Sequence, residues 1–290
     1  MQLVIDILFA FSLYILVAYG FSICYIILGF FHMAHAISLT IGAYLVFTSS
    51  IIIAMPLWLS IVLSAVVVVS LMALINRGIY MPDKKRGLEG WQLMIVSLGI
   101  YVVLQNVVSL IWGDSTLTFR TWPVKSGHPI MGGIITDVQI ITVAVSSLLL
   151  LTVWLLLEKT NIGMKLKAAS SNPSLSTFFG VRKELVSTVG IAIGSALMAC
   201  AGILIAADID MTPTMGFDWL MYGVVAMIIG GMGKMRYMIF GALLLATAQQ
   251  LSAYFLDSKW MNATAYIILV IFLYFRPFGF SGKKLKKTEV

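Results

Sequence analysis

Long apolar runs fill most of this sequence and constrain its fold more than any other feature. The first covers residues 3–27, and as an α-helix it is long enough to cross a hydrocarbon core of about 30 Å. Backbone groups inside such a core must pair within the protein, so runs of this length are typical of transmembrane helices. With 60% hydrophobic and 11% charged residues, the composition excludes a soluble globular protein. We therefore predict an all-α, polytopic transmembrane bundle.

The boundaries of the apolar runs predict nine spans in a single domain covering residues 1–290. The predicted spans are residues 3–27, 29–49, 57–75, 91–112, 134–157, 186–206, 219–231, 238–255 and 261–274. Polar residues and glycines interrupt residues 29–42 and 230–241, so broken helices are expected there, with eight or ten spans as alternatives. The first run lacks a preceding Lys or Arg and exceeds the apolar core of a signal peptide, so we expect it to be retained.

Basic residues lie mostly in loops beside the spans, and their placement predicts the orientation. Residues 76–90 and 159–184 are rich in Lys and Arg, which marks cytoplasmic loops. Residues 113–133 contain few basic residues and residues 208–218 contain none, so both are expected outside. The β-prone residues 116–122 suggest a short hairpin in the first of these. The N-terminus is then outside and the lysine-rich C-terminus inside, and this orientation explains the net charge of +7 without nucleic acid as a partner.

The hydrophilic segment of residues 159–184 is the most distinctive cytoplasmic feature. Within it, Asn172 is a typical helix N-cap, Pro173 suits the first helical position, and Gly180 is a typical stop. These residues predict a helix of about two turns outside the bilayer. Its apolar contact face would consist of Leu175, Phe178 and Phe179. We interpret this segment as a docking site for another protein.

The second span begins with the least apolar intramembrane stretch of the chain. It carries His32, His35, Ser38 and Thr40. Such polar side chains are costly against lipid, so this stretch should face a cavity or other helices. A metal site needs at least a third convergent ligand, and the remaining histidine lies in an outside loop, so we predict no metal. Two roles stay open for the histidines: packing with a hydrogen bond at a helix end, or lining of a solute path.

Two further features lie within the spans. Gln105 and Asn106 are neighbouring amides in the fourth span, where they would form an interhelical hydrogen bond or contact a solute in its path. Gly190 and Gly194 lie one turn apart in the sixth span, and small residues at this spacing let helix backbones approach closely.

The chain shows no machinery for driving transport by itself. Every Asp and Glu lies in a loop or near the end of a predicted span, whereas ion-coupled carriers generally need ionisable groups within the membrane. Gly230, Gly231 and Gly233 lack the spacing of a nucleotide-binding loop. We therefore expect no enzymatic activity and no cofactor, and energy supplied by a partner.

Several motifs distributed over nearly the whole chain resemble one family. They are residues 18–22 (AYGFS), 31–35 (FHMAH), 41–44 (IGAY), 168–180, 229–233 (IGGMG) with Gly241, and 276–279 (RPFG). Together they resemble the permease subunits of ATP-binding-cassette importers for branched-chain amino acids, whose close relatives import urea or short amides.

This sequence also departs from the motifs of that family. His35 matches the signature histidine, while His32, Ala36 and Ile37 replace the usual Asn, Gly and Glu. Ser174 stands where an acidic residue is customary. The residues that replace the usual Ser, Pro and Gly after the glycine motif are Lys234, Arg236 and Tyr237. These departures concern the solute rather than the family.

The resemblance implies a heteromeric importer in the bacterial inner membrane. Its partners would be a second related permease, two cytoplasmic ATPases and a periplasmic solute-binding protein that carries most of the specificity. The residues expected to couple to an ATPase are Ala168, Asn172, Pro173, Ser174, Leu175, Phe178, Phe179 and Gly180. The alternatives are a urea, amide or sugar permease of the same superfamily, a stand-alone secondary transporter, and an intramembrane enzyme with a histidine-bound metal.

Overall fold

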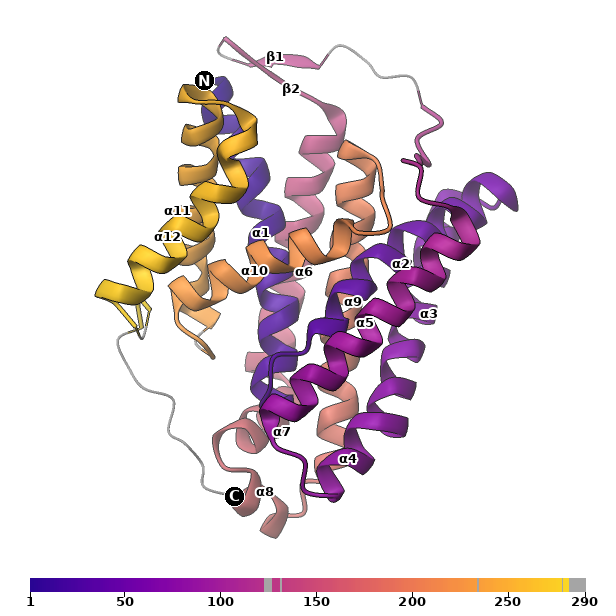
Figure 1. Ribbon diagram of the computed structural model, residues 1–290, viewed down its shortest axis with the longest axis vertical. Coiled ribbons are helices and arrows are strands. Elements are labelled where there is room, and N and C mark those ends of the chain that lie inside the picture. The colour runs from indigo at the N-terminus through magenta and orange to yellow at the C-terminus, as the bar shows by residue number, and fades with distance from the viewer. Residues whose placement is uncertain (123–126, 131, 234, 278, 282–290) are drawn as a thin grey trace.

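The computed structural model describes residues 1–122, 127–130, 132–233, 235–277 and 279–281 as an all-helical bundle (Figure 1). The long helices are α1 (Gln2–Leu28), α2 (Ala36–Phe47), α3 (Leu57–Ile75), α5 (Gly90–Trp112), α6 (Asp137–Lys159), α9 (Lys183–Ile209), α10 (Met215–Gly230), α11 (Met235–Phe255) and α12 (Met261–Phe275). The shorter helices are α4 (Met81–Lys85), α7 (Asn161–Ser171) and α8 (Pro173–Phe178), with 3-10 turns η1 (Met33–His35) and η4 (Ser258–Trp260) and π turns η2 (Thr48–Ile52) and η3 (Asn76–Tyr80). The N-terminus lies at one end of the bundle, and α4, α7 and α8 lie at the other.

Within these described ranges, eight helical runs are long and apolar enough to cross a membrane. The sequence predicts nine spans, with eight or ten as alternatives, and the structure agrees with the alternative of eight. The predicted span 219–231 belongs to α10, whose 16 residues are too few for a crossing. In Figure 1, α10 runs crosswise to α1 and α6, and it packs against α1, α2 and α11. Asp218, predicted to lie in an outside loop, is in the first turn of α10.

The predicted loop at residues 76–90 is largely helical. A single helical run extends from Leu57 to Lys85 through α3, η3 and α4. Pro82 does not end this run; it is the second residue of α4 and follows directly after the π turn η3, where the regular α-helical hydrogen-bond pattern is already interrupted.

The short hairpin predicted within residues 113–133 lies further along the chain. Strands β1 (His128–Ile130) and β2 (Gly133–Ile135) form an antiparallel pair at the end of the bundle that holds the N-terminus. The β-prone residues 116–122 instead contribute a single bridge, from Leu117 to Met211. The position of the hairpin was therefore wrong, because β propensity alone does not select the partner strand.

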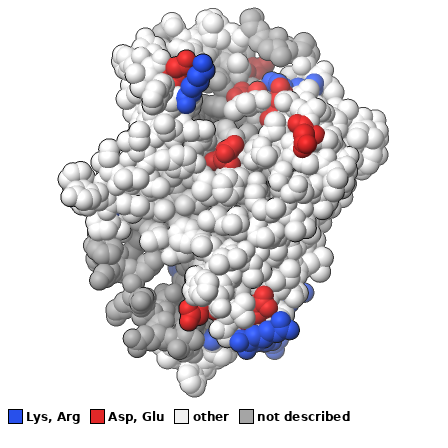
Figure 2. Space-filling model, in the orientation of Figure 1, with Lys and Arg blue, Asp and Glu red and all other residues white. Residues whose placement is uncertain are grey.

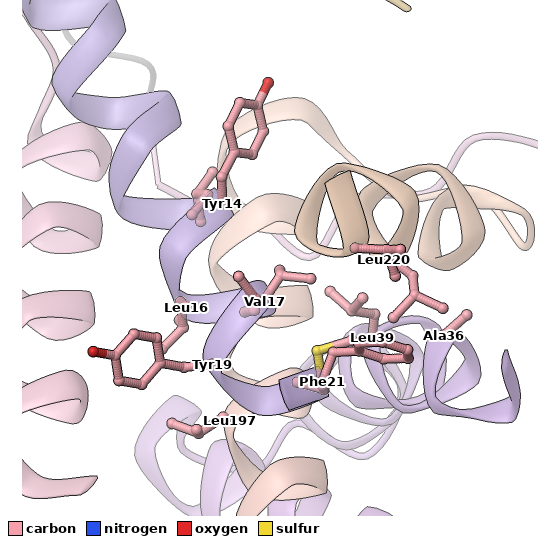
Figure 3. Close-up of a cluster of buried hydrophobic side chains, with 14 of the residues drawn as sticks. Tyr14, Leu16, Val17, Tyr19, Phe21, Ala36, Leu39, Leu197 and Leu220 are labelled. Atoms are coloured by element: carbon pink, nitrogen blue, oxygen red, sulfur yellow. The ribbon is translucent and has the colours of Figure 1, made fainter. Parts of the chain in front are cut away.

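The centre of the bundle is formed by α1 and α9, which pack against each other. From Phe9 to Cys24 almost every side chain of α1 is buried, because this helix is apolar on all faces and other helices surround it. Figure 3 shows this core with Tyr14, Leu16, Val17, Tyr19 and Phe21 of α1, Ala36 and Leu39 of α2, Leu197 of α9 and Leu220 of α10. The outer faces of α3, α5, α6 and α12 expose many large apolar side chains, as expected against lipid or another subunit.

Small residues let α9 approach α1 and α2 closely, as the sequence predicts. A Cβ added to Gly194 would stand 2.7 Å from the carbonyl oxygen of Gly20 on α1. Gly42 of α2 faces Ala199 of α9 in the same way, with 2.9 Å between an added Cβ and the Ala199 Cα. Larger residues at these positions would force the helices apart.

Glycines break two helical runs, which confirms the expectation for residues 29–42 and 230–241. Gly29 has a φ of 76° and ends α1, and the next helical turn begins at Met33. Gly231 and Gly233 have φ values of 110° and 79° between α10 and α11. Positive φ values are favourable for glycine, so these residues fix where the helices stop.

The charged side chains gather towards the two ends of the face shown in Figure 2, with a broad uncharged region between them. The end with α7 and α8 carries the basic residues of the docking segment, and the opposite end carries the N-terminus and the hairpin. This distribution agrees with the orientation predicted from the loops. Lys234, Phe278 and the lysines of residues 283–287 lie outside the described residues.

Candidate functional site

The break between α1 and α2 carries both intramembrane histidines. His35 closes η1 directly before α2, and His32 is the residue before η1. The two side chains are 0% and 1% exposed, and their ring centroids lie 5.5 Å apart. The structure thus places them in one buried cluster, together with Cys24 of α1 and Tyr80 of η3.

His32 is held on one side only. Its Nε2 lies 2.9 Å from the Tyr80 hydroxyl oxygen. The rings of Phe30 and Tyr80 meet the imidazole edge-on, with centroids at 5.9 and 5.0 Å. Its Nδ1 has no hydrogen-bond partner among the described residues. One polar atom of this buried ring is therefore left over for another partner.

His35 packs between α1 and α9. Its Nε2 lies 3.8 Å from the Cys24 sulfur, the range of a weak sulfur hydrogen bond. A Cβ added at Gly194 would lie 3.4 Å from the Cε1 atom of His35, so the imidazole ring packs against this glycine. In the part of the chain that the structure describes, no three His, Cys, Asp or Glu side chains are grouped so that they could hold a metal ion.

Buried hydroxyl groups continue along α2 from the histidines. Ser38 and Thr40 are fully buried, and their side-chain oxygens have no hydrogen-bond partner among the described residues. The same holds for Ser22 on α1 and Tyr44 on α2. A buried polar atom without a partner is destabilising, so several of them in and beside one helix are not explained by packing alone.

The amides of α5 are not part of this cluster. The Gln105 amide nitrogen lies 3.4 Å from Ser109 Oγ, and the Asn106 amide donates to the Val102 carbonyl oxygen at 2.7 Å. Both bonds stay within α5, so the suggested interhelical hydrogen bond is not formed by these contacts. Each amide lies one helical turn from its partner on the same helix. Such local hydrogen bonds form readily and compete with a bond to another helix.

The docking segment, residues 159–184, contains the helix that its sequence predicts. The Asn172 side-chain oxygen accepts a hydrogen bond from the Leu175 N–H at 2.9 Å, which is the predicted N-cap. Pro173 occupies the first helical position, and Gly180, with a φ of 78°, follows the end of the helix. These sequence signals fix where α8 begins and ends.

The apolar face of α8 projects away from the protein. The side chains of Leu175, Phe178 and Phe179 are 53%, 88% and 80% exposed. Ala168 connects α8 to α7, since its carbonyl oxygen accepts the Asn172 N–H at 3.1 Å. The side chains of Pro173 and Ser174 lie outside what the structure describes. Neighbouring exposed phenylalanines on a capped helix are suited to insertion into a partner.

The sequence analysis missed α7, the helix that carries α8. Thr160 caps it by accepting the Gly163 N–H at 3.2 Å, and Leu166 is buried beneath it. An ion pair of 2.8 Å between Lys167 and Glu158 ties α7 back to the end of α6. The cap at Thr160 is the signal that could have revealed this helix.

Two lysines of α4 connect the docking segment to the break after α1. Lys85 forms an ion pair of 2.8 Å with Glu184, the last residue of the docking segment, which lies in the first turn of α9. Lys84 donates to the carbonyl oxygen of Leu28, the last residue of α1, and its Nζ lies 5.7 Å from the centre of the Phe30 ring. A cation suits the negative end of a helix dipole. A continuous set of contacts thus leads from α8 to the helix break.

The glycine motif and the closing motif meet at the junction of α10 and α11. A Cβ at Gly230 would stand 2.6 Å from the Met238 Cα, so α10 and α11 touch through their backbones. Gly279 packs on this junction, with 2.7 Å between an added Cβ and the Gly231 Cα. Two motifs that are far apart in the sequence therefore form one closely packed unit.

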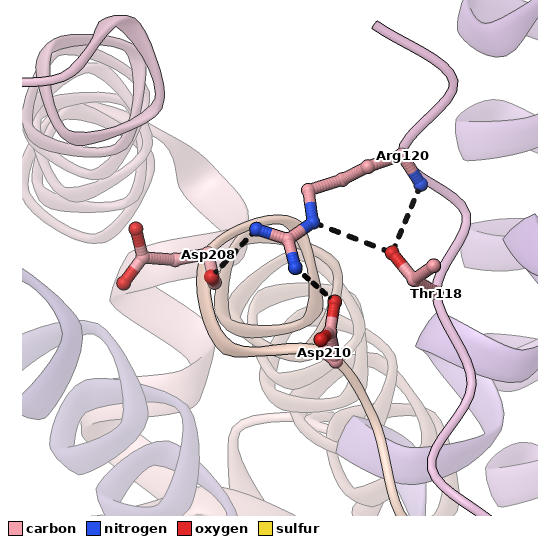
Figure 4. A network of polar contacts seen from close by, with 4 residues as sticks. All are labelled: Thr118, Arg120, Asp208 and Asp210. Atoms are coloured by element: carbon pink, nitrogen blue, oxygen red, sulfur yellow. Dashed lines mark hydrogen bonds and ion pairs between the residues drawn. The ribbon is translucent and has the colours of Figure 1, made fainter. Parts of the chain in front are cut away.

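A polar network at the outer end was not expected from the sequence. In Figure 4, Arg120 reaches from the loop after α5 to the end of α9, where it pairs with Asp210 and donates to the Asp208 carbonyl oxygen at 3.0 Å. The Thr118 hydroxyl accepts from the Arg120 Nε at 3.3 Å. Asp210 has a φ of 74°, and the arginine holds it in this unusual conformation. The network fastens the loop after α5 to the end of α9.

The chain is similar to known permeases along nearly its whole length. A sequence model of the family described as "Branched-chain amino acid transport system / permease component" matches residues 3–275. The high-affinity branched-chain amino acid transport system permease protein LivH of Salmonella typhimurium is 26% identical over 94% of this chain and 92% of its own. BraD of Pseudomonas aeruginosa, described in the same words, is also 26% identical with the same coverage. A probable LivH of Methanocaldococcus jannaschii is 26% identical over 96% of this chain and 91% of its own.

A solved structure shares the fold. The structure described as PsaBC from Streptococcus pneumoniae in complex with Fab matches with a TM-score of 0.55 over 100% of this chain and 96% of that chain. The sequences are only 11% identical, so the match concerns the arrangement of helices alone.

Proposed function

Since this chain belongs to the family of permease components of branched-chain amino acid transport systems, we propose that it is the membrane subunit of an ATP-binding-cassette importer. Its solutes are branched-chain or related small amino acids. A permease of such a system works with ATPase and binding-protein partners. In our proposal a second homologous permease and two cytoplasmic ATPases complete the assembly in the bacterial inner membrane, and a periplasmic protein delivers the solute.

The exposed tip of α8 carries this proposal. Phe178 and Phe179 are exposed at the end of a short helix outside the membrane-spanning runs, where lipid would not cover them, and the N-cap at Asn172 keeps their helix formed. Contact with an ATPase subunit would bury both rings. The basic residues around α8 agree with a cytoplasmic position, where the ATPase would lie.

The contacts beyond α8 suggest how ATP-driven motion reaches the membrane helices. A displacement of α8 would move the first turn of α9. The ion pair of Glu184 with Lys85 would transmit this movement to α4. Lys84 would then pull on the end of α1 at Leu28, next to the break at Gly29. A broken helix can change direction at little cost, so this break is suited to switching between outward and inward openings.

The solute path would begin at this break and run along the buried polar side chains next to it. His32, His35 and Ser38 are among these side chains, and the unpartnered His32 Nδ1 and Ser38 oxygen could bind polar groups when the path opens. Gln105 and Asn106 remain candidates for the same path from α5, although they do not join the cluster in this conformation.

The deciding experiment is gentle extraction of the tagged chain from its native membrane, followed by identification of the copurifying proteins. An ATPase, a second permease of similar length, and leucine uptake that needs ATP and a binding protein in liposomes are expected. A chain that comes out alone and transports with only an ion gradient would contradict the proposal. Urea or amide uptake without leucine uptake would contradict the solute class but not the assembly.

The docking face has its own test in the same preparation. The change of Phe178→Asp with Phe179→Asp should dissociate the ATPase or uncouple its hydrolysis from transport, because charges would enter an apolar contact. The matched control of Phe178→Leu with Phe179→Leu keeps the face apolar and should retain the ATPase. Normal assembly and transport in the aspartate variant would show that α8 is not the docking element.

A further inference from the structure

A groove at the α4 end of the bundle is assigned no ligand by the transport proposal, although the Lys85–Glu184 pair on its wall belongs to the proposed coupling path. It has a volume of about 600 Å³ and lies between the η3 and α4 region and the start of α9. Arg77, Lys85 and Arg182 contribute its positive charges. Its apolar walls include Met81, Leu185 and Val189. It therefore combines a basic rim with an apolar interior.

The positive charge of this groove is only partly neutralised. Lys85 is paired with Glu184, whose carboxylate also lines the groove. The Arg77 and Arg182 side chains are exposed, and neither guanidinium forms a hydrogen bond or a close ion pair with another described residue. The hydrogen bond from Lys85 lowers the pKa of the Glu184 carboxyl, and the charge of Arg77 also acts on this carboxylate and helps to lower its pKa. Two guanidinium groups therefore remain available to one ligand. Because a guanidinium presents parallel N–H donors, it matches the oxygens of a phosphate better than an ammonium does.

The position of the groove suggests where such a phosphate comes from. The groove lies at the end of the long helical run Leu57–Lys85, where a span leaves the membrane on its basic side. Headgroups of the inner leaflet lie at this level. The walls of Met81, Leu185 and Val189 could contact the glycerol and the first carbons of an acyl chain, which a free phosphate does not have. Basic pockets between helices on the cytoplasmic side are typical sites for acidic lipids.

We propose that this groove binds the headgroup of an acidic phospholipid from the inner leaflet, with Arg77 and Arg182 on its phosphate. The site requires no particular solute, and it stands whether or not the transport proposal does. Because the groove includes the Lys85–Glu184 pair, a bound lipid would brace the contact between α4 and the start of α9.

The test is native mass spectrometry of the detergent-purified full chain together with the subunits that copurify. Phosphatidylglycerol is titrated against phosphatidylcholine with the same acyl chains, and inorganic phosphate and glycerol 3-phosphate are added as competitors. We expect retention of phosphatidylglycerol and no displacement by either soluble anion. The change of Arg77→Gln with Arg182→Gln should weaken this binding about tenfold or more, since it removes two cations that attract the anionic headgroup.

Matched variants separate the groove from general charge. The change of Lys159→Gln with Lys165→Gln removes two cations of the same basic end that do not line the groove, and it should leave the affinity unchanged. The change of Arg77→Lys with Arg182→Lys keeps the charge and should lose less than the glutamine variant. This lysine variant and the competition on the unchanged chain decide the question even if the glutamine variant does not fold.

Several results would overturn the proposal. Equal retention of phosphatidylcholine, or an equal loss in the Lys159 and Lys165 variant, would show that the groove does not select the headgroup. Displacement of the lipid by inorganic phosphate would identify a soluble-anion site instead. Binding to the permease alone that disappears once the ATPase is present would mean that the groove is a protein contact.

Discussion

Gly194 on α9 stands so close to Gly20 on α1 that a Cβ added to Gly194 would lie 2.7 Å from the Gly20 carbonyl oxygen. The same added atom would lie 2.5 Å from the Cys24 sulfur. The histidine cluster rests on this contact, since the His35 ring also lies against Gly194. The two central helices and the candidate site therefore share one glycine.

Replacing Gly194 should destabilise the protein even when the new side chain is only a methyl group. Gly194→Ala would overpack the contact and cost about 1–3 kcal/mol, which lowers the melting temperature of the purified protein in detergent. Gly99→Ala is the matched control, because nothing lies within 4 Å of an added Cβ there and alanine favours a helix interior. Equal melting temperatures for the two variants would contradict the close packing of α1 and α9.

The sequence predicts those parts of the fold that depend on local chemistry. Apolar runs locate the spans, glycines locate the breaks at Gly29 and Gly231, and an N-cap with a stop locates α8. Each of these signals acts within one or two helical turns, so it can be recognised without knowing what packs nearby.

The parts that the sequence does not predict depend on distant partners. Tyr80 reaches His32 across 48 residues, and Arg120 reaches Asp210 across 90. The direction of α10 is likewise set by the helices around it, because an apolar run indicates burial but not whether the helix crosses the membrane or lies across other helices. The histidines stand out in the sequence as unusual for a membrane span, but the groups that surround them are defined only in three dimensions.

The hydrogen bond between His32 and Tyr80 should contribute to stability. Tyr80→Phe removes the hydroxyl and leaves the His32 Nε2 buried without its partner, at a cost of about 1–3 kcal/mol. Tyr44→Phe is the control, because the Tyr44 hydroxyl is buried and has no partner among the described residues, so its removal should be neutral or slightly stabilising. The measurement is thermal unfolding in detergent, and a larger loss for Tyr44→Phe than for Tyr80→Phe would contradict the assignment.

The N-cap of α8 should affect partner binding more than the stability of the membrane bundle. Asn172→Ala removes the acceptor for the Leu175 N–H and costs α8 about 1 kcal/mol. The affinity of a purified ATPase subunit should then fall about fivefold, with the melting temperature of the permease unchanged. Asn172→Ser keeps a capping oxygen and should restore most of the affinity. An unchanged affinity in the alanine variant would mean that α8 need not be preformed.

The outer network should hold the loop after α5 in place. Arg120→Gln removes the pair with Asp210 and the charge-assisted bond to the Asp208 carbonyl, which should release the bridge between Leu117 and Met211. Loss of a bond to a charged group costs about 1.5–3 kcal/mol, so the amide hydrogens of Leu117 and Met211 should exchange on the order of tenfold faster or more. Arg86→Gln is the control, because its pair with Asp83 is 3.5 Å long and its side chain is 75% exposed. Unchanged exchange at both amides in the Arg120 variant would show that the bridge holds the loop without the arginine.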